Sequence, residues 1–74
     1  MKAVYIVREQ LSDHDDVVVY ARRADANRHV REFAKEYDMP KPESAPGGCL
    51  HSLLWELDGA WTVGSERKEI LSHE

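Results

Sequence analysis

Residues 53–63 read LLWELDGAWTV, and this stretch decides the fold. Asp58-Gly59 favours a two-residue type I′ turn, because both central positions of that turn need a positive φ. The predicted turn pairs Leu57 with Ala60 and forms a hairpin of two strands. One face of this hairpin then carries Leu53, Trp55, Leu57, Ala60 and Thr62, and the other carries Leu54, Glu56, Trp61 and Val63. Both faces are largely apolar, so one packs on the core and the other is expected to be an interaction surface.

Four strands are predicted in all. Residues 3–9 (AVYIVRE) and 17–22 (VVVYAR) are rich in β-branched and aromatic side chains, which favour strands. Residues 10–16 (QLSDHDD) read as the polar turn between them, and the short connection predicts an antiparallel pair. Residues 50–57 and 60–65 form the two strands of the later hairpin.

The hydrophobic period changes to that of a helix in the middle of the chain. Asp25 is the predicted N-cap, since its carboxylate can accept from free N–H groups of the first turn. The helix is expected to end near Asp38, because Pro40 disfavours the α conformation before it. Residues 39–48 (MPKPESAPGG) read as a long irregular loop, and residues 67–74 as a short edge strand or a frayed turn. The core face of the helix is Ala26, Val30, Phe33, Ala34 and Tyr37.

These elements predict one α+β domain of 74 residues, in the order β-β-α-β-β. A single helix packs on a four- or five-stranded antiparallel sheet, which satisfies the two-layer rule. A domain this small buries only about 60% of its unfolded surface, so we expect marginal stability and benefit from a partner.

The chain is mildly acidic, with a formal net charge of -4. No apolar run approaches the roughly 18 residues needed to span a bilayer, and the N-terminus enters a strand pattern without a signal-peptide core. A lone cysteine, Cys49, excludes an intrachain disulfide. We therefore expect a cytoplasmic protein.

No catalytic motif, cofactor site or metal site is predicted, and an enzyme is the least favoured class. The acidic turn at residues 13–16 lacks the glycine and glutamate that an EF-hand loop needs at its sixth and twelfth positions. Cys49 and His51 are too few for a zinc site, since zinc takes three or four such ligands. Gly47-Gly48 is followed by neither Lys-Ser/Thr nor a helix, which excludes a phosphate-binding loop.

Two groups of residues remain as contact candidates. Residues 22–35 hold five basic and two acidic side chains. Arg28, Arg31 and Lys35 on the outer helix face could meet phosphates or an acidic protein, although Glu32 interrupts the series. Trp55 and Trp61 lie on opposite hairpin faces, so one is expected in the core while the other anchors an interface.

The opening residues 1–9 (MKAVYIVRE) resemble the start of small phage-encoded anti-CRISPR proteins that act on type I-F systems. Those proteins share the order of strand, acidic turn, strand, helix and hairpin, with a tryptophan just after the turn; here Asp58-Gly59-Ala60-Trp61 holds that place. The resemblance implies a non-enzymatic inhibitor that docks on a subunit of a host type I CRISPR surveillance complex and blocks target DNA. Compact acidic surfaces can occupy a groove meant for nucleic acid.

The first hypothesis is therefore a phage or mobile-element inhibitor in the host bacterial cytoplasm. Its contact candidates are Asp13, Asp15, Asp16, Glu56, Asp58 and Trp61. The second hypothesis is a small nucleic-acid-binding module that uses Arg28, Arg31 and Lys35. The third is an antitoxin-like homodimer whose seam is the second face of the hairpin.

Overall fold

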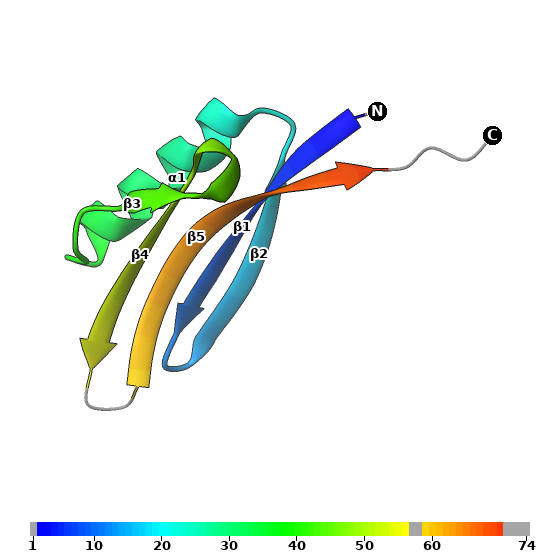
Figure 1. The fold of residues 1–74 in the computed structure, drawn as a ribbon. Coiled ribbons are helices and arrows are strands. Elements are labelled where there is room, and N and C mark those ends of the chain that lie inside the picture. The colour runs from blue at the N-terminus through cyan, green and yellow to red at the C-terminus, as the bar shows by residue number, and fades with distance from the viewer. Residues whose placement is uncertain (1, 57–58, 71–74) are drawn as a thin grey trace.

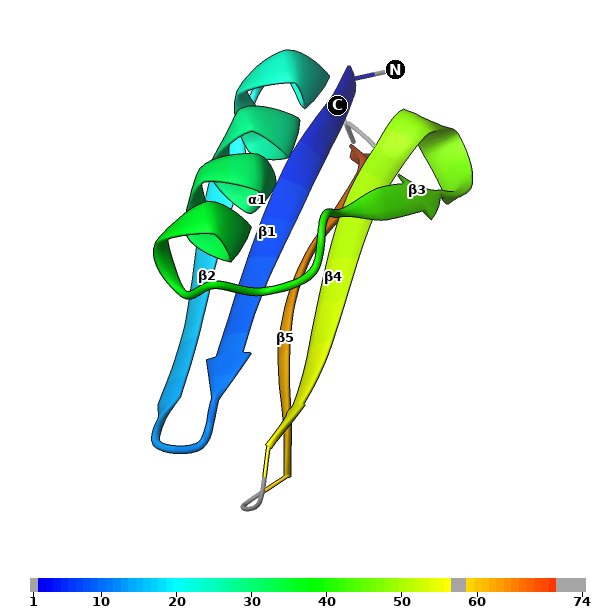
Figure 2. The same cartoon turned by 90° about the vertical axis from the view of Figure 1, so that its left-hand side faces the viewer.

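A computed structural model describes residues 2–56 and 59–70. The elements are β1 (Lys2–Leu11), β2 (His14–Tyr20), α1 (Arg23–Glu36), β3 (Glu43–Ala45), the 3-10 turn η1 (Pro46–Gly48), β4 (Cys49–Glu56) and β5 (Gly59–Ile70). The five strands form one antiparallel sheet in the order β2-β1-β5-β4-β3. Figure 2 shows α1 lying across one face of this sheet. The predicted α+β class and the single helix on an antiparallel sheet are confirmed.

The fifth strand comes from the segment that was predicted to be irregular. Glu43–Ala45 pairs with Cys49–His51 at one edge of the sheet, and η1 makes the tight return between them. Gly47 and Gly48 both have a positive φ, of 79° and 74°, which glycine adopts without steric cost. The prediction of an irregular loop for this segment was therefore wrong. Pro46 and the two glycines reverse the direction of the chain, so that Glu43–Ala45 pairs with β4.

The first hairpin is longer than predicted. β1 continues to Leu11 and β2 begins at His14, so only Ser12 and Asp13 remain as the turn. Asp15 and Asp16 pair with Gln10 and Glu9 as strand residues. Turn propensity therefore predicted too long a turn. Pairing with β1 holds Asp15 and Asp16 in a strand despite their preference for turns.

The register of the second hairpin differs from the prediction. Glu56 pairs with Gly59 and Leu54 with Trp61, so Gly59 begins β5 and is not a turn residue. Leu57 and Asp58 lie outside the described residues. Each pairing is displaced by two positions, which leaves each described side chain on its predicted face. Burial in the core therefore does not discriminate between the two registers. The Asp58-Gly59 dipeptide alone was not sufficient to predict which pairs of residues lie opposite one another.

β5 runs without interruption to Ile70, and along its length it pairs with β1 from Lys2 to Gln10. The short edge strand or frayed turn predicted for residues 67–74 is therefore, as far as Ile70, the end of this central strand. Residues 71–74 lie outside the described part of the chain.

The helix spans Arg23–Glu36, so it both begins and ends earlier than predicted. Arg22 is the N-cap, so Asp25 lies in the first turn and the predicted cap was wrong. Asp25 still favours this end of the helix, because an acidic side chain complements the helix dipole there. Asp38 takes a left-handed conformation with φ 55°, and the N–H of Met39 donates to the carbonyl of Ala34 at 2.7 Å. This Schellman-type ending closes the helix.

The core lies between α1 and the covered face of the sheet. Its fully buried members from the strands are Val7 and Val63, which meet Val30 on the helix. The predicted helix face is confirmed for its four buried positions: Ala26, Val30, Phe33 and Ala34. The fifth predicted position, Tyr37, is the C-cap residue and is 37% exposed. Met39 is buried as well, just beyond the turn that ends the helix.

Candidate functional site

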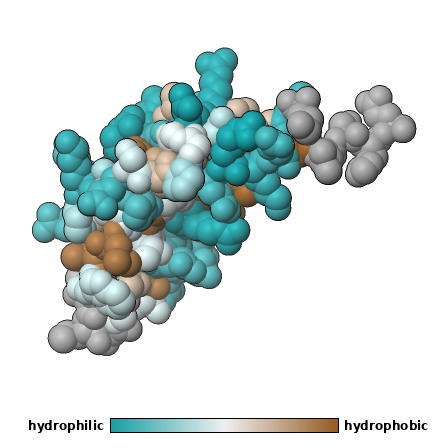
Figure 3. Space-filling model, in the orientation of Figure 1, coloured by the Kyte–Doolittle hydropathy of each residue, from teal (hydrophilic) through white to brown (hydrophobic). Residues whose placement is uncertain are grey.

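The face of the sheet opposite α1 has no covering layer among the described residues, and we call it the open face. It carries Ile6 and Arg8 of β1, Val17 and Val19 of β2, and Leu53 and Trp55 of β4, together with their neighbours on β5. Val19 is 58% exposed and Trp55 is 73% exposed. Figure 1 shows the sheet with α1 on one side only, and the space-filling view in Figure 3 shows hydrophobic surface near the β4–β5 hairpin. Large apolar side chains exposed together usually mark a contact surface.

The two tryptophans separate as the hairpin pattern predicted. Trp61 lies on the covered face, packs against the core cluster and meets Tyr37 edge to face, with ring centroids 6.3 Å apart. Trp55 lies on the open face beside Leu53, which is 40% exposed. The exposed anchor is therefore Trp55, whereas Trp61 was the residue named as a contact candidate.

The middle of the open face is hollowed by about 350 Å³. Gly64 forms its floor between Arg8 and His51, which are its partners on the neighbouring strands. A Cβ at Gly64 would lie 3.2 Å from the Cβ of His51, so a larger residue would crowd this part of the sheet. The surface is thus a shallow depression bordered by apolar and charged side chains.

One exposed ion pair crosses the open face. Nη2 of Arg8 lies 3.3 Å from Oε1 of Glu66. Both side chains are more than half exposed, so the pair contributes at most about 1 kcal/mol to folding. Its two charges remain available to a partner.

The acidic candidates of the first hairpin lie at the same end of the sheet as the exposed tryptophan. β1 and β4 both run toward that end in Figures 1 and 2. Asp15 lies in one row with Gln10, Thr62 and Leu53 across four adjacent strands. With strands about 4.8 Å apart, Asp15 and Leu53 are about 14 Å from one another. Asp16 points to the covered face, and the side chain of Glu56 and all of Asp58 lie outside the described part.

The basic candidates lie on the other side of the molecule. Arg28 forms an ion pair with Asp25 on the same helix. Arg31 and Lys35 are exposed and, among the described residues, form no ion pair. The structure therefore does not bring the basic group together with Asp15, the acidic candidate on the open face, into one surface.

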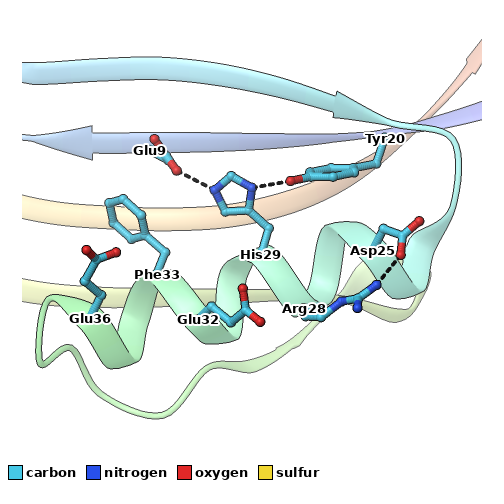
Figure 4. A pocket seen from close by; sticks show the side chains of 8 residues that line it. All are labelled: Glu9, Tyr20, Asp25, Arg28, His29, Glu32, Phe33 and Glu36. Atoms are coloured by element: carbon cyan, nitrogen blue, oxygen red, sulfur yellow. Dashed lines mark hydrogen bonds and ion pairs between the residues drawn. The ribbon is translucent and has the colours of Figure 1, made fainter.

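A second polar site lies between α1 and the first hairpin, around the carboxylate of Glu9. The Glu9 side chain is only 10% exposed, and both of its oxygens are engaged. Nε2 of His14 lies 3.0 Å from Oε1, and Nε2 of His29 contacts Oε2. With its proton on Nε2, His29 accepts at Nδ1 from the hydroxyl of Tyr20, 2.7 Å away. Figure 4 shows the chain of contacts from Tyr20 through His29 to Glu9.

The electrostatics of this site follow from the buried carboxylate. The hydrogen bond to Glu9 raises the pKa of His14 above its usual value, and the charges of Glu9, Asp16 and Asp13 act in the same direction. A cavity of about 280 Å³ opens beside Glu9 and His29, with Arg28 and Glu32 on its helix side. Carboxylate and imidazole groups in this arrangement can hold a proton or a cation.

The sequence interpretation missed Glu9 because it was assigned to the end of a strand before a solvated turn. One signal was present: Glu9 follows Tyr5 and Val7 in the alternation of β1, so it faces the helix with them. Cys49 and His51 lie two residues apart on β4 but differ in environment. Cys49 is 1% exposed and His51 is exposed on the open face.

Comparison of the chain with models of known protein families, with characterised proteins and with solved structures finds no match. No helix in the described residues is long and apolar enough to cross a membrane.

Proposed function

We propose that this protein acts by binding a protein partner through the open face and catalyses no reaction. The observation that carries this proposal is Trp55, which is 73% exposed on a sheet face that no element of the described residues covers. Leaving an indole ring in water forgoes the roughly 1.5–3 kcal/mol that burial of a large apolar side chain contributes. A domain with so small a core benefits from recovering that energy at an interface.

The composition of the open face favours a protein as the ligand. Tryptophan and arginine are enriched among the residues that dominate binding energy, and Trp55 and Arg8 supply both. Leu53, Val17 and Val19 give the apolar surroundings that exclude water from such anchors. The hollow over Gly64 offers a depression into which a partner side chain can insert.

The proposed partner is a subunit of a type I CRISPR surveillance complex in the cytoplasm of a bacterial host, and the action is inhibition of target DNA binding. Support for this narrower proposal is the resemblance of residues 1–9 and the acidic end of the first hairpin. Asp13 and Asp15 are exposed beside the open face, where they complement a basic groove built for nucleic acid.

The test is binding of the purified protein to a reconstituted type I-F complex, followed by a competition assay with fluorescent target DNA. The proposal expects a stoichiometric complex and displacement of the DNA. Type I-E complex, assembled in parallel, serves as the comparison for subtype. An absence of binding to both complexes at micromolar concentration would contradict the partner assignment.

Self-association through the same open face is the second candidate, because two apolar sheet faces can cover one another. Light scattering at high protein concentration separates the two proposals: a dimer that Trp55→Ala converts to a monomer favours self-association.

The nucleic-acid alternative rests on Arg28, Arg31 and Lys35 and is tested by gel shift with random duplex DNA at low salt. Arg28 is already paired with Asp25, which weakens this alternative.

A further inference from the structure

Two carboxylates face one another directly across the first hairpin. Glu9 of β1 and Asp16 of β2 are register partners on the covered face of the sheet. Like charges directly opposite in an antiparallel pair destabilise it, so this arrangement favours a compensating cation between the strands. Because Glu9 is only 8% exposed, solvent screens its charge poorly.

An imidazole completes a ligand set at the same point. One ligand atom from each of Glu9, His14 and Asp16 lies within 4.8 Å of the others. The Nε2 atom of His14 and Oε1 of Glu9 are 3.0 Å apart. A tetrahedral zinc ion with bonds near 2.0 Å holds its ligand atoms roughly 3.3 Å apart. The His14–Glu9 distance of 3.0 Å is close to that spacing, and side-chain rotation has to close the remaining distances, which are at most 4.8 Å.

An outer layer of contacts orients the buried ligand. His29 of α1 holds Oε2 of Glu9, the oxygen that does not meet His14, and Tyr20 fixes the other nitrogen of His29. Metal sites characteristically have such outer partners, which set the direction and basicity of the ligating groups. These contacts come from α1 and from the end of β2, so residues other than the three ligands hold the Glu9 carboxylate in place.

We propose that Glu9, His14 and Asp16 form a site for one divalent transition-metal ion of the zinc class. One imidazole nitrogen and two carboxylate oxygens suit zinc, and they leave a fourth position for water. The side chain of His14 is 42% exposed, so the ion reaches the site from solvent without unfolding. The ion would neutralise the facing carboxylates and join β1 to β2.

The experiment is a calorimetric titration of the tag-free, EDTA-treated protein with zinc chloride, with magnesium chloride as the reference metal. The expected result is one ion per chain and a clear preference for zinc over magnesium. His14→Ala removes the imidazole ligand at an exposed position and should weaken zinc binding at least tenfold. His51→Ala removes an exposed imidazole from the open face and should leave the affinity unchanged.

A second readout identifies the ligands independently. Zinc should shift the imidazole nitrogen resonance of His14 in a long-range nitrogen–proton spectrum. At equal zinc concentration it should raise the melting temperature of the wild type more than that of His14→Ala. The proposal is overturned if wild-type protein binds no zinc stoichiometrically. It is equally overturned if His14→Ala binds as tightly as wild type, or if magnesium binds as tightly as zinc.

Discussion

Trp61→Ala and Trp55→Ala remove the same side chain from opposite faces of one hairpin, and the structure predicts very different costs. Truncating a fully buried tryptophan costs about 3–5 kcal/mol. Trp61 is partly buried against the core and against Tyr37, so we expect a loss of about 2–3 kcal/mol. Trp55 is 73% exposed, so its truncation should cost no more than about 0.5 kcal/mol.

These differences are large relative to the whole stability of the fold. A domain of 74 residues has a free energy of unfolding of about 4–11 kcal/mol. Each kcal/mol corresponds to about 4–8 °C in melting temperature at this size. Trp61→Ala should therefore lower the melting temperature by about 10–20 °C, whereas Trp55→Ala should lower it by less than about 4 °C.

The assay is thermal and urea unfolding of both variants, followed by far-ultraviolet circular dichroism. A double-mutant cycle with Tyr37→Ala should return a coupling of about 0.5–1.5 kcal/mol for Trp61 and none for Trp55. Equal losses for the two tryptophan variants, or a greater loss for Trp55→Ala, would refute the assignment of the covered and open faces.

Three further outcomes test the described contacts. Asp38→Gly should stabilise the protein by about 0.5 kcal/mol in urea unfolding, because Asp38 has φ 55° at the end of α1 and glycine has no Cβ to strain there. Ser65→Ala should destabilise it by about 1–3 kcal/mol, because the buried hydroxyl donates to Asn27 at 2.8 Å and accepts from the N–H of Leu50 at 3.1 Å. Cys49 is 1% exposed, so its thiol should react with Ellman's reagent only as fast as the protein opens, and a rapid reaction of the native protein would contradict its burial.

The sequence predicted those features that depend on side-chain period. Alternation along the hairpin separated Trp55 from Trp61, and the helical period identified the buried positions Ala26, Val30, Phe33 and Ala34. Both patterns follow from which side chains must leave water, and a shift of two residues in register does not change them.

Features that depend on competition between local and tertiary preferences were not predicted. Asp15 and Asp16 favour turns, yet the ladder to β1 holds them in a strand. The short strand Glu43–Ala45 has no hydrophobic period of its own and exists because η1 returns the chain to β4.

The site around Glu9 was missed for a related reason. Its members come from β1, β2 and α1, and they meet only through the register of the hairpin and the crossing of the helix. Spacing along the chain places His29 20 residues from Glu9, so no local motif joins them.

The central claim is that the open face is the contact surface, and one comparison of dissociation constants tests it most directly. The measurement is the affinity of the type I-F complex for wild-type protein, Trp55→Ala and Arg31→Ala, each first shown to be folded. Loss of an interface anchor costs 2 kcal/mol or more, so Trp55→Ala should weaken binding by roughly thirtyfold or more, while Arg31→Ala on the helix should leave it unchanged. Unchanged binding by Trp55→Ala, together with weakened binding by Arg31→Ala, would contradict this account and place the contact on the helix.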